Sequence, residues 1–282
     1  MERLRRLPRP PSQLPSARLP QMPTAITGQG LRRHILHQSK RANVGHIGSA
    51  LSVADILAAL YGGVLRGEPD DPDRDRFVMS KGHAALALYA ALHMAGHLSQ
   101  DVLDTFGRDE TLLGVHPHHG LAGVDFSTGS LGQGLAMGAG AALAAKLQGS
   151  RRRVFVLLSD AECNEGSVWE AAMFAAHHQL GNLVAIVDLN HQQALGYTKD
   201  VIALEPLEDR WRAFGWDVHS VDGHDQEALA GAMAGLSGGL PHVLVAHTTF
   251  GKGVSFMESQ IRWHYMPMDD QQYGAALAEI GD

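Results

Sequence analysis

The chain has 282 residues, of which 45% are hydrophobic, and its formal net charge is -7. This length allows one large core, and the mild acidity gives no general attraction for nucleic acid or anionic membranes. No uninterrupted apolar run reaches the roughly 18 residues of a membrane-spanning helix. The single cysteine, Cys163, excludes a disulfide within the chain and favours a reducing, cytoplasmic location.

Residues 1–26 are rich in proline and arginine and show no apolar periodicity. This composition predicts a disordered or extended arm, and its prolines argue against the amphipathic helix of a transit peptide. An over-called start codon explains the segment equally well. We expect one folded domain over residues 27–282.

The rest of the chain alternates between helical and strand-like patterns. In chain order it predicts a helix over 28–41, a buried helix over 53–65, a strand over 77–79, a helix over 84–95, a helix over 135–147, a strand over 154–158, a helix over about 165–179, a strand over 183–187, a helix over about 204–214, a strand over 216–221, a helix over about 225–236, a strand over 243–246 and a short C-terminal helix. This order predicts an α/β fold, a parallel sheet with helices on both faces.

Two of the predicted strands end on residues with side-chain oxygens. Asp160 follows the strand over 154–158, and Asn190 follows the strand over 183–187. Ligands of α/β proteins bind at these carboxyl ends, and Mg²⁺ prefers a few protein oxygens together with phosphate oxygens. We therefore predict that Asp160, Asn190 and the backbone near Gln192 hold Mg²⁺ on a diphosphate, with the small Ala161 allowing close approach. The simpler alternative is that Asp160 and Asn190 only end strands and cap turns.

Among the 17 histidines, four stand out by their surroundings: His46, His83, His116 and His264. A histidine picked at random from so many is more often a surface or core residue than a catalytic one. None of the four has the spacing of zinc ligands. Imidazoles that line one cleft would suit proton transfer and hydrogen bonds to sugar hydroxyls.

The segment from Ser159 to Asn190 resembles the thiamine-diphosphate motif, which begins Gly-Asp-Gly and ends in Asn about thirty residues later. Within it, the stretch from Asp160 to Ala171 is similar to the transketolase family. Here the opening reads Ser159-Asp160-Ala161. Further stretches similar to transketolase motifs, in the same order along the chain, are Gly45-His46-Ile47-Gly48, Ser80-Lys81-Gly82-His83, Val115-His116-Pro117-His118, Gly129-Ser130-Leu131-Gly132-Gln133-Gly134 and Gly251 to Glu258 with His264 beyond it.

The resemblance implies a thiamine-diphosphate-binding fold and the transfer of a two-carbon ketol unit from a ketose, or its phosphate, to an aldose. It implies thiamine diphosphate and Mg²⁺ as cofactors, and Glu165 resembles a glutamate that links paired active sites. The cofactor-binding residues implied by the family are His83, Gly129, Ser130, Leu131, Asp160, Ala161, Glu165, Asn190 and His264. The four singled-out histidines are implied to contact diphosphate or sugar.

In transketolases a separate pyrimidine-binding domain carries a further essential glutamate, whereas this chain ends at Asp282, directly after the diphosphate-binding region. The resemblance therefore implies the N-terminal subunit of a split transketolase. A second polypeptide would carry the pyrimidine-binding domain, the assembly would be a heterotetramer, and this chain would be inactive alone. Two alternatives stay open: an E1α-like subunit of a 2-oxo acid dehydrogenase, and a non-catalytic thiamine-diphosphate-binding scaffold subunit.

Overall fold

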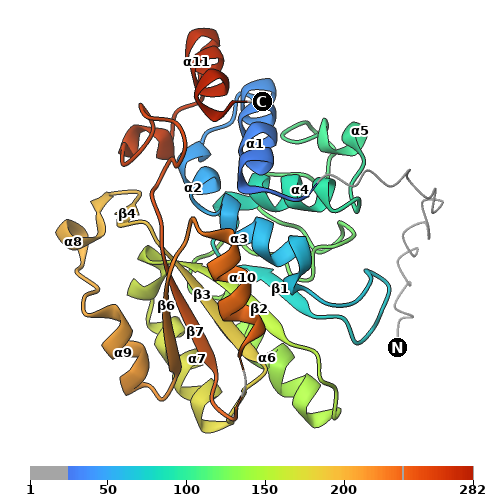
Figure 1. The fold of residues 1–282 in the computed structure, drawn as a ribbon, viewed down its shortest axis with the longest axis vertical. Coiled ribbons are helices and arrows are strands. Elements are labelled where there is room, and N and C mark those ends of the chain that lie inside the picture. The colour runs from blue at the N-terminus through green and yellow to red at the C-terminus, as the bar shows by residue number, and fades with distance from the viewer. Residues whose placement is uncertain (1–24, 237, 282) are drawn as a thin grey trace, which may run out of the picture.

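The computed structural model describes residues 25–236 and 238–281, so the arm expected over residues 1–26 lies almost wholly outside the described residues. A five-stranded parallel sheet forms the centre of the molecule (Figure 1). Its strands, in spatial order, are β1 (Arg76–Met79), β2 (Val154–Ser159), β3 (Leu183–Leu189), β7 (His242–His247) and β6 (Asp217–Asp222). A small antiparallel pair, β4 (Gln192–Gln193) and β5 (Gly196–Tyr197), lies beyond β3 in the chain.

Successive residues of the central strands contribute to two separate cores. Phe155 and Leu157 of β2 pack on one face of the sheet, while Val154 and Val156 pack on the other. This follows from the two-residue period of a strand, and it explains why β2 and β3 are apolar throughout most of their length and fully buried. The predicted α/β fold with both faces covered is confirmed.

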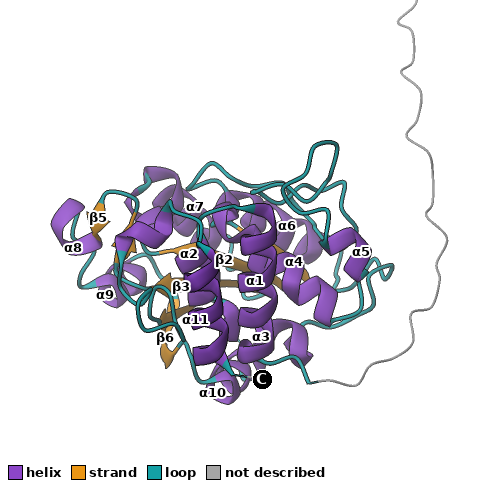
Figure 2. Ribbon diagram, turned by 90° about the horizontal axis from the view of Figure 1, so that it is seen from above, coloured by secondary structure: helices purple, strands orange, loops and turns teal. Residues whose placement is uncertain are grey.

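The helices fall into two layers that cover these two cores. The first layer contains α1 (Gly28–Ala42), α2 (Ile47–Ser52), α3 (Ala54–Ala59), α4 (Ala85–Met94), α10 (Gln226–Ala234) and α11 (Asp270–Ile280). The second contains α6 (Gly134–Leu147), α7 (Gly166–His177) and α9 (Leu207–Ala213). In the first layer the C-terminal helix α11 runs beside α1, as both views show (Figure 2).

The remaining helical segments are short. They are α5 (Gln100–Leu103), α8 (Thr198–Val201), a π-helical turn (Leu60–Val64) and three 3₁₀ turns (Gly82–Ala84, Ala161–Asn164 and Ile261–His264). None of the helices described within residues 25–236 and 238–281 combines the length and apolarity needed to cross a lipid bilayer.

The helix predicted over 53–65 is wrong in its boundaries. α2 already begins at Ile47, Val53 separates α2 from α3, and α3 gives way to the π-helical turn at Leu60. Gly63 has φ +152°, which a helix cannot contain but a glycine adopts freely because it has no Cβ. The helix predicted from about residue 204 starts only at Leu207, because the residue before Pro206 is disfavoured in helical conformation.

Candidate functional site

Asp160 and Asn190 come together at the carboxyl edge of the sheet. Asp160 follows β2 and is buried, and its Oδ1 accepts a hydrogen bond from the Ala161 amide at 2.7 Å. Its Oδ2 accepts from the amide of His191 at 2.8 Å and from Oγ1 of Thr198 at 3.1 Å. His191 directly follows Asn190, so the predicted metal ligands lie on adjoining turns.

The donor set of this edge fits a magnesium ion. A carboxylate has about four lone-pair sites and an amide oxygen two, so Asp160 keeps a free site beyond its three hydrogen bonds. Asn190 keeps one as well, because its Oδ1 accepts only the Gln192 amide, at 2.9 Å. Burial, together with the nearby Asp188, raises the pKa of Asp160 to about 7. A bound cation would remove that cost to the charged carboxylate.

A buried ion pair, which the sequence interpretation did not include, lies directly behind these ligands. Lys81 Nζ bonds to Asp188 Oδ2, and both side chains are fully buried. Asp188 also accepts hydrogen bonds from Ser52 Oγ at 2.6 Å, from Thr248 Oγ1 and from Asn190 Nδ2 at 2.8 Å. This network fixes the amide of Asn190 with its oxygen turned away from Asp188. In the sequence, the only indication of this pair was Asp188, an ionisable residue near the end of the apolar strand β3.

Three of the four singled-out histidines form one cluster, which we call the histidine trio: His46, His83 and His264. The ring centroids lie 5.6 Å apart for His46 and His83, 5.3 Å for His46 and His264, and 5.6 Å for His83 and His264. Burial lowers the pKa of all three, that of His264 to about 4 and that of His83 well below its usual value. The trio is therefore uncharged at neutral pH.

Two glycines let the chain close around the trio. A Cβ on Gly45 would lie 2.3 Å from the carbonyl oxygen of Tyr265, and one on Gly48 would lie 2.1 Å from the Phe250 ring. The same Phe250 ring stacks on His264, with centroids 5.9 Å apart and planes 5° from parallel. The glycines that flank His46 therefore bring the C-terminal segment carrying His264 against it.

His116 lies at the exposed side of this cluster. Its ring packs on the glycine-rich turn predicted to bind cofactor, because a Cβ on Gly129 would lie 3.2 Å from it. Gly82, next to His83, packs on the same turn, because a Cβ on Gly82 would lie 2.9 Å from the backbone of Gly129. A charge on His116 would lower the pKa of His46 and of His83, which indicates that it is close to both. In the same turn Ser130 is exposed and Leu131 is half-buried.

Two glutamates of the motif differ sharply in their surroundings. Glu162, which the sequence interpretation missed, is buried and accepts hydrogen bonds from Ser80 Oγ and from the Gly132 amide, the latter at 2.7 Å. It thereby ties the glycine-rich turn to the ends of β1 and β2. Glu165 is exposed at the start of α7, beside Gly132, and its carboxylate makes no hydrogen bond to any described residue. Sequence alone could not tell them apart, because both lie in one short motif.

Comparison with known proteins gives consistent results. Residues 29–281 match the family model "Transketolase, thiamine diphosphate binding domain". The chain is 42% identical to one subunit of the apulose-4-phosphate transketolase of Phocaeicola vulgatus, over 89% of this chain and 91% of that protein. It is 41% identical to the 6-deoxy-6-sulfo-D-fructose transketolase subunit SqwG of a Clostridium species, over 89% of this chain and 93% of that protein.

The fold is also that of solved transketolases. The crystal structure of transketolase from Campylobacter jejuni superposes with a TM-score of 0.85 at 32% identity, covering 91% of this chain but only 42% of that chain. The transketolase of Leishmania mexicana superposes with a TM-score of 0.83, over 40% of its length. With these matches added to its motifs and its fold, the chain belongs to the family of transketolase thiamine-diphosphate-binding domains.

Proposed function

We propose that this chain is the N-terminal subunit of a two-chain transketolase, which moves a two-carbon ketol unit from a ketose or ketose phosphate to an aldose. The observation that carries the proposal is that α2 links the two groups in one family fold. Its Ser52 bonds to Asp188, which also bonds to Asn190, and its Ser49 lies 3.1 Å from His83 of the trio. The two-chain form is supported by relatives named as transketolase subunits, which align over 91% and 93% of their length.

Asp160, the side-chain oxygen of Asn190 and the backbone carbonyl of Gln192 would hold Mg²⁺ and, through it, the diphosphate of thiamine diphosphate. The small Ala161 and the turn at Gly129 would let phosphate oxygens approach the backbone closely. When bound, this cofactor supplies an electron sink for breaking a carbon–carbon bond. The chain itself anchors the diphosphate and orients the substrate.

The histidine trio would hold the hydroxyls of the sugar and relay protons. A neutral imidazole donates through one ring nitrogen and accepts through the other, so it serves either role. The Nδ1 atoms of His46 and His264 are buried and have no hydrogen-bond partner among the described residues. Each therefore keeps an unused hydrogen-bonding position, which a substrate hydroxyl would fill once the site rearranges to admit it. His116, more exposed, would meet the substrate at the entrance.

A second chain would complete the site with a pyrimidine-binding domain, in a heterotetramer. Support comes from the exposed carboxylate of Glu165 at the start of α7 and from Met173 and Phe174, exposed apolar side chains on the same helix. In the proposed assembly a partner surface would cover these two side chains. The free and buried thiol of Cys163 fits a cytoplasmic assembly.

The test compares the purified chain with a complex formed with a partner captured from the native host. We expect no ketol transfer by the chain alone and turnover by the complex in the presence of Mg²⁺ and thiamine diphosphate. Asp160→Ala should abolish turnover and magnesium-dependent cofactor binding, whereas Asp209→Ala, on the exposed surface, should leave both unchanged. Full turnover by the isolated chain, or normal cofactor binding by the Asp160 variant, would refute the proposal.

A further inference from the structure

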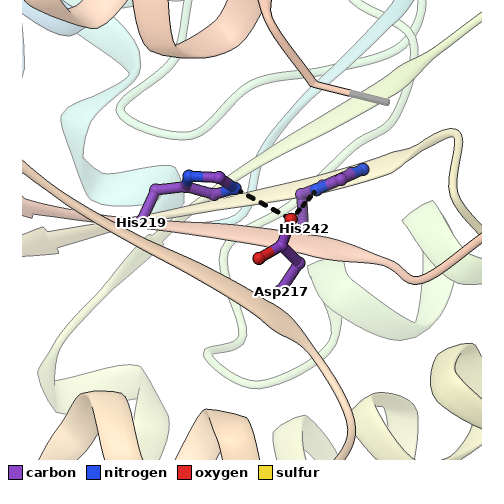
Figure 3. A group of neighbouring side chains, drawn as sticks. All are labelled: Asp217, His219 and His242. Carbon is purple, nitrogen blue, oxygen red and sulfur yellow. Dashed lines mark hydrogen bonds and ion pairs between the residues drawn. The ribbon is translucent and has the colours of Figure 1, made fainter. Parts of the chain in front are cut away.

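Asp217, His219 and His242 form a compact cluster far from the site described above. Asp217 and His219 are two residues apart on β6, so their side chains point to the same face of the sheet. His242, the first residue of β7, stands opposite Asp217 in the parallel register. The cluster therefore lies where these strands begin, at the sheet edge opposite the Asp160–Asn190 edge, and Figure 3 shows the three side chains converging.

The spacing of the cluster matches that of zinc ligands. Oδ2 of Asp217 lies 3.2 Å from Nε2 of His219 and 3.3 Å from Nδ1 of His242. Zinc bonds of about 2.0–2.1 Å in a tetrahedron place neighbouring ligand atoms roughly 3.3 Å apart. All three ligand atoms lie within 4.8 Å of one another, so only the two imidazole nitrogens would need to draw closer.

His242 gives independent support for a ligand. The residue is only 1% exposed; its Nδ1 lies 3.3 Å from Asp217 Oδ2 without hydrogen-bond geometry, and its Nε2 makes no hydrogen bond to any described residue. A buried polar group that lacks a well-formed hydrogen bond is costly and calls for an explanation.

We propose that Asp217, His219 and His242 form a zinc site that joins the edge strand β6 to β7. Two imidazoles and one carboxylate are donors that Zn²⁺ favours over Mg²⁺. The side chains of His219 and Asp217 are 36% and 47% exposed, so the ion can enter from solvent and keep water in its fourth position. The ligands come from separate strands, which is why no sequence spacing indicated them.

Titration of the full-length, chelator-treated chain with ZnCl₂ tests the site, using calorimetry and Co²⁺ absorption as a probe of coordination geometry. We expect one equivalent to bind, with a tetrahedral Co²⁺ spectrum. Asp217→Asn and His219→Ala should each weaken binding by at least about tenfold. His247→Ala is the matched control, since this exposed histidine lies at the other end of β7, and it should bind zinc as the unaltered chain does.

A second readout is thermal unfolding, since a ligand that binds only the folded state raises the melting temperature. Zinc should raise it for the unaltered chain and for the His247 variant but not for the Asp217 and His219 variants. Absence of zinc binding, or binding that survives both substitutions, would overturn the proposal. So would binding lost in His264→Ala but kept in His219→Ala, because the histidine trio would then be the zinc site. None of these measurements depends on transketolase activity.

Discussion

Replacing Lys81 by methionine should reveal how much the buried Lys81–Asp188 ion pair behind the Asp160–Asn190 edge contributes to stability. Lys81 and Asp188 are both fully buried, and Asp188 lies close enough to Asp160 to raise the pKa of that carboxylate. Without the ammonium, Asp188 keeps only neutral hydrogen-bond donors. Removing one partner of such a pair costs about 3–5 kcal/mol, because the other charge is left buried and uncompensated.

Urea unfolding of the isolated chain, followed by circular dichroism, measures this cost. With a slope of about 3 kcal/mol per molar urea, the midpoint should fall by roughly 1 to 1.7 M. The double variant Lys81→Met, Asp188→Asn should be more stable than the single one, since no buried charge remains. Arg212→Met, which removes an exposed pair with Asp209, should cost at most about 1 kcal/mol. The reasoning fails if the Lys81 variant loses no more stability than the Arg212 variant.

Two further predictions concern the packing and the charge of the site. Gly134→Ala should cost about 1–3 kcal/mol in urea unfolding, because its Cβ would lie 2.1 Å from Ser80 Oγ and 2.4 Å from Ser80 Cβ. Gly140→Ala, with open space in the same helix, should instead stabilise by up to about 1 kcal/mol, and equal effects would contradict the clash. His264 should titrate near pH 4 by NMR, against 6.5 when unfolded. Its contribution to stability is therefore full above pH 6.5 and lost as pH falls toward 4, and a midpoint at or above 6.5 would show that burial does not disfavour the charge of His264.

Much of the architecture could be read from local patterns. The apolar runs of β2 and β3 predicted fully buried parallel strands, and the uniformly apolar α4 predicted a buried helix, because burial on every side leaves no room for polar residues. The interruption at Gly63 escaped notice, since hydrophobic periodicity continues through a backbone kink. The predicted order of strands and helices did not determine how β7 enters between β3 and β6.

The candidate site, too, could be predicted from the sequence only in part. Asp160 and Asn190 could be paired from the sequence because the carboxyl ends of neighbouring parallel strands meet at one edge. The Lys81–Asp188 pair and the buried Glu162 could not, since their importance lies in contacts between residues far apart in the chain. Asp217 and His242 were missed for the same reason, because only the register of β6 on β7 brings them together.

The lack of charge in the histidine trio has a consequence for selectivity. Neutral rings offer polarity and shape but no Coulombic attraction, so in the proposed role they would bind the hydroxylated part of a sugar equally well whether or not it bears a phosphate. Preference for an anionic over an uncharged sugar must then originate with cations elsewhere in the assembled enzyme. A change of substrate from one sugar to another could accordingly evolve without any substitution in the histidine trio.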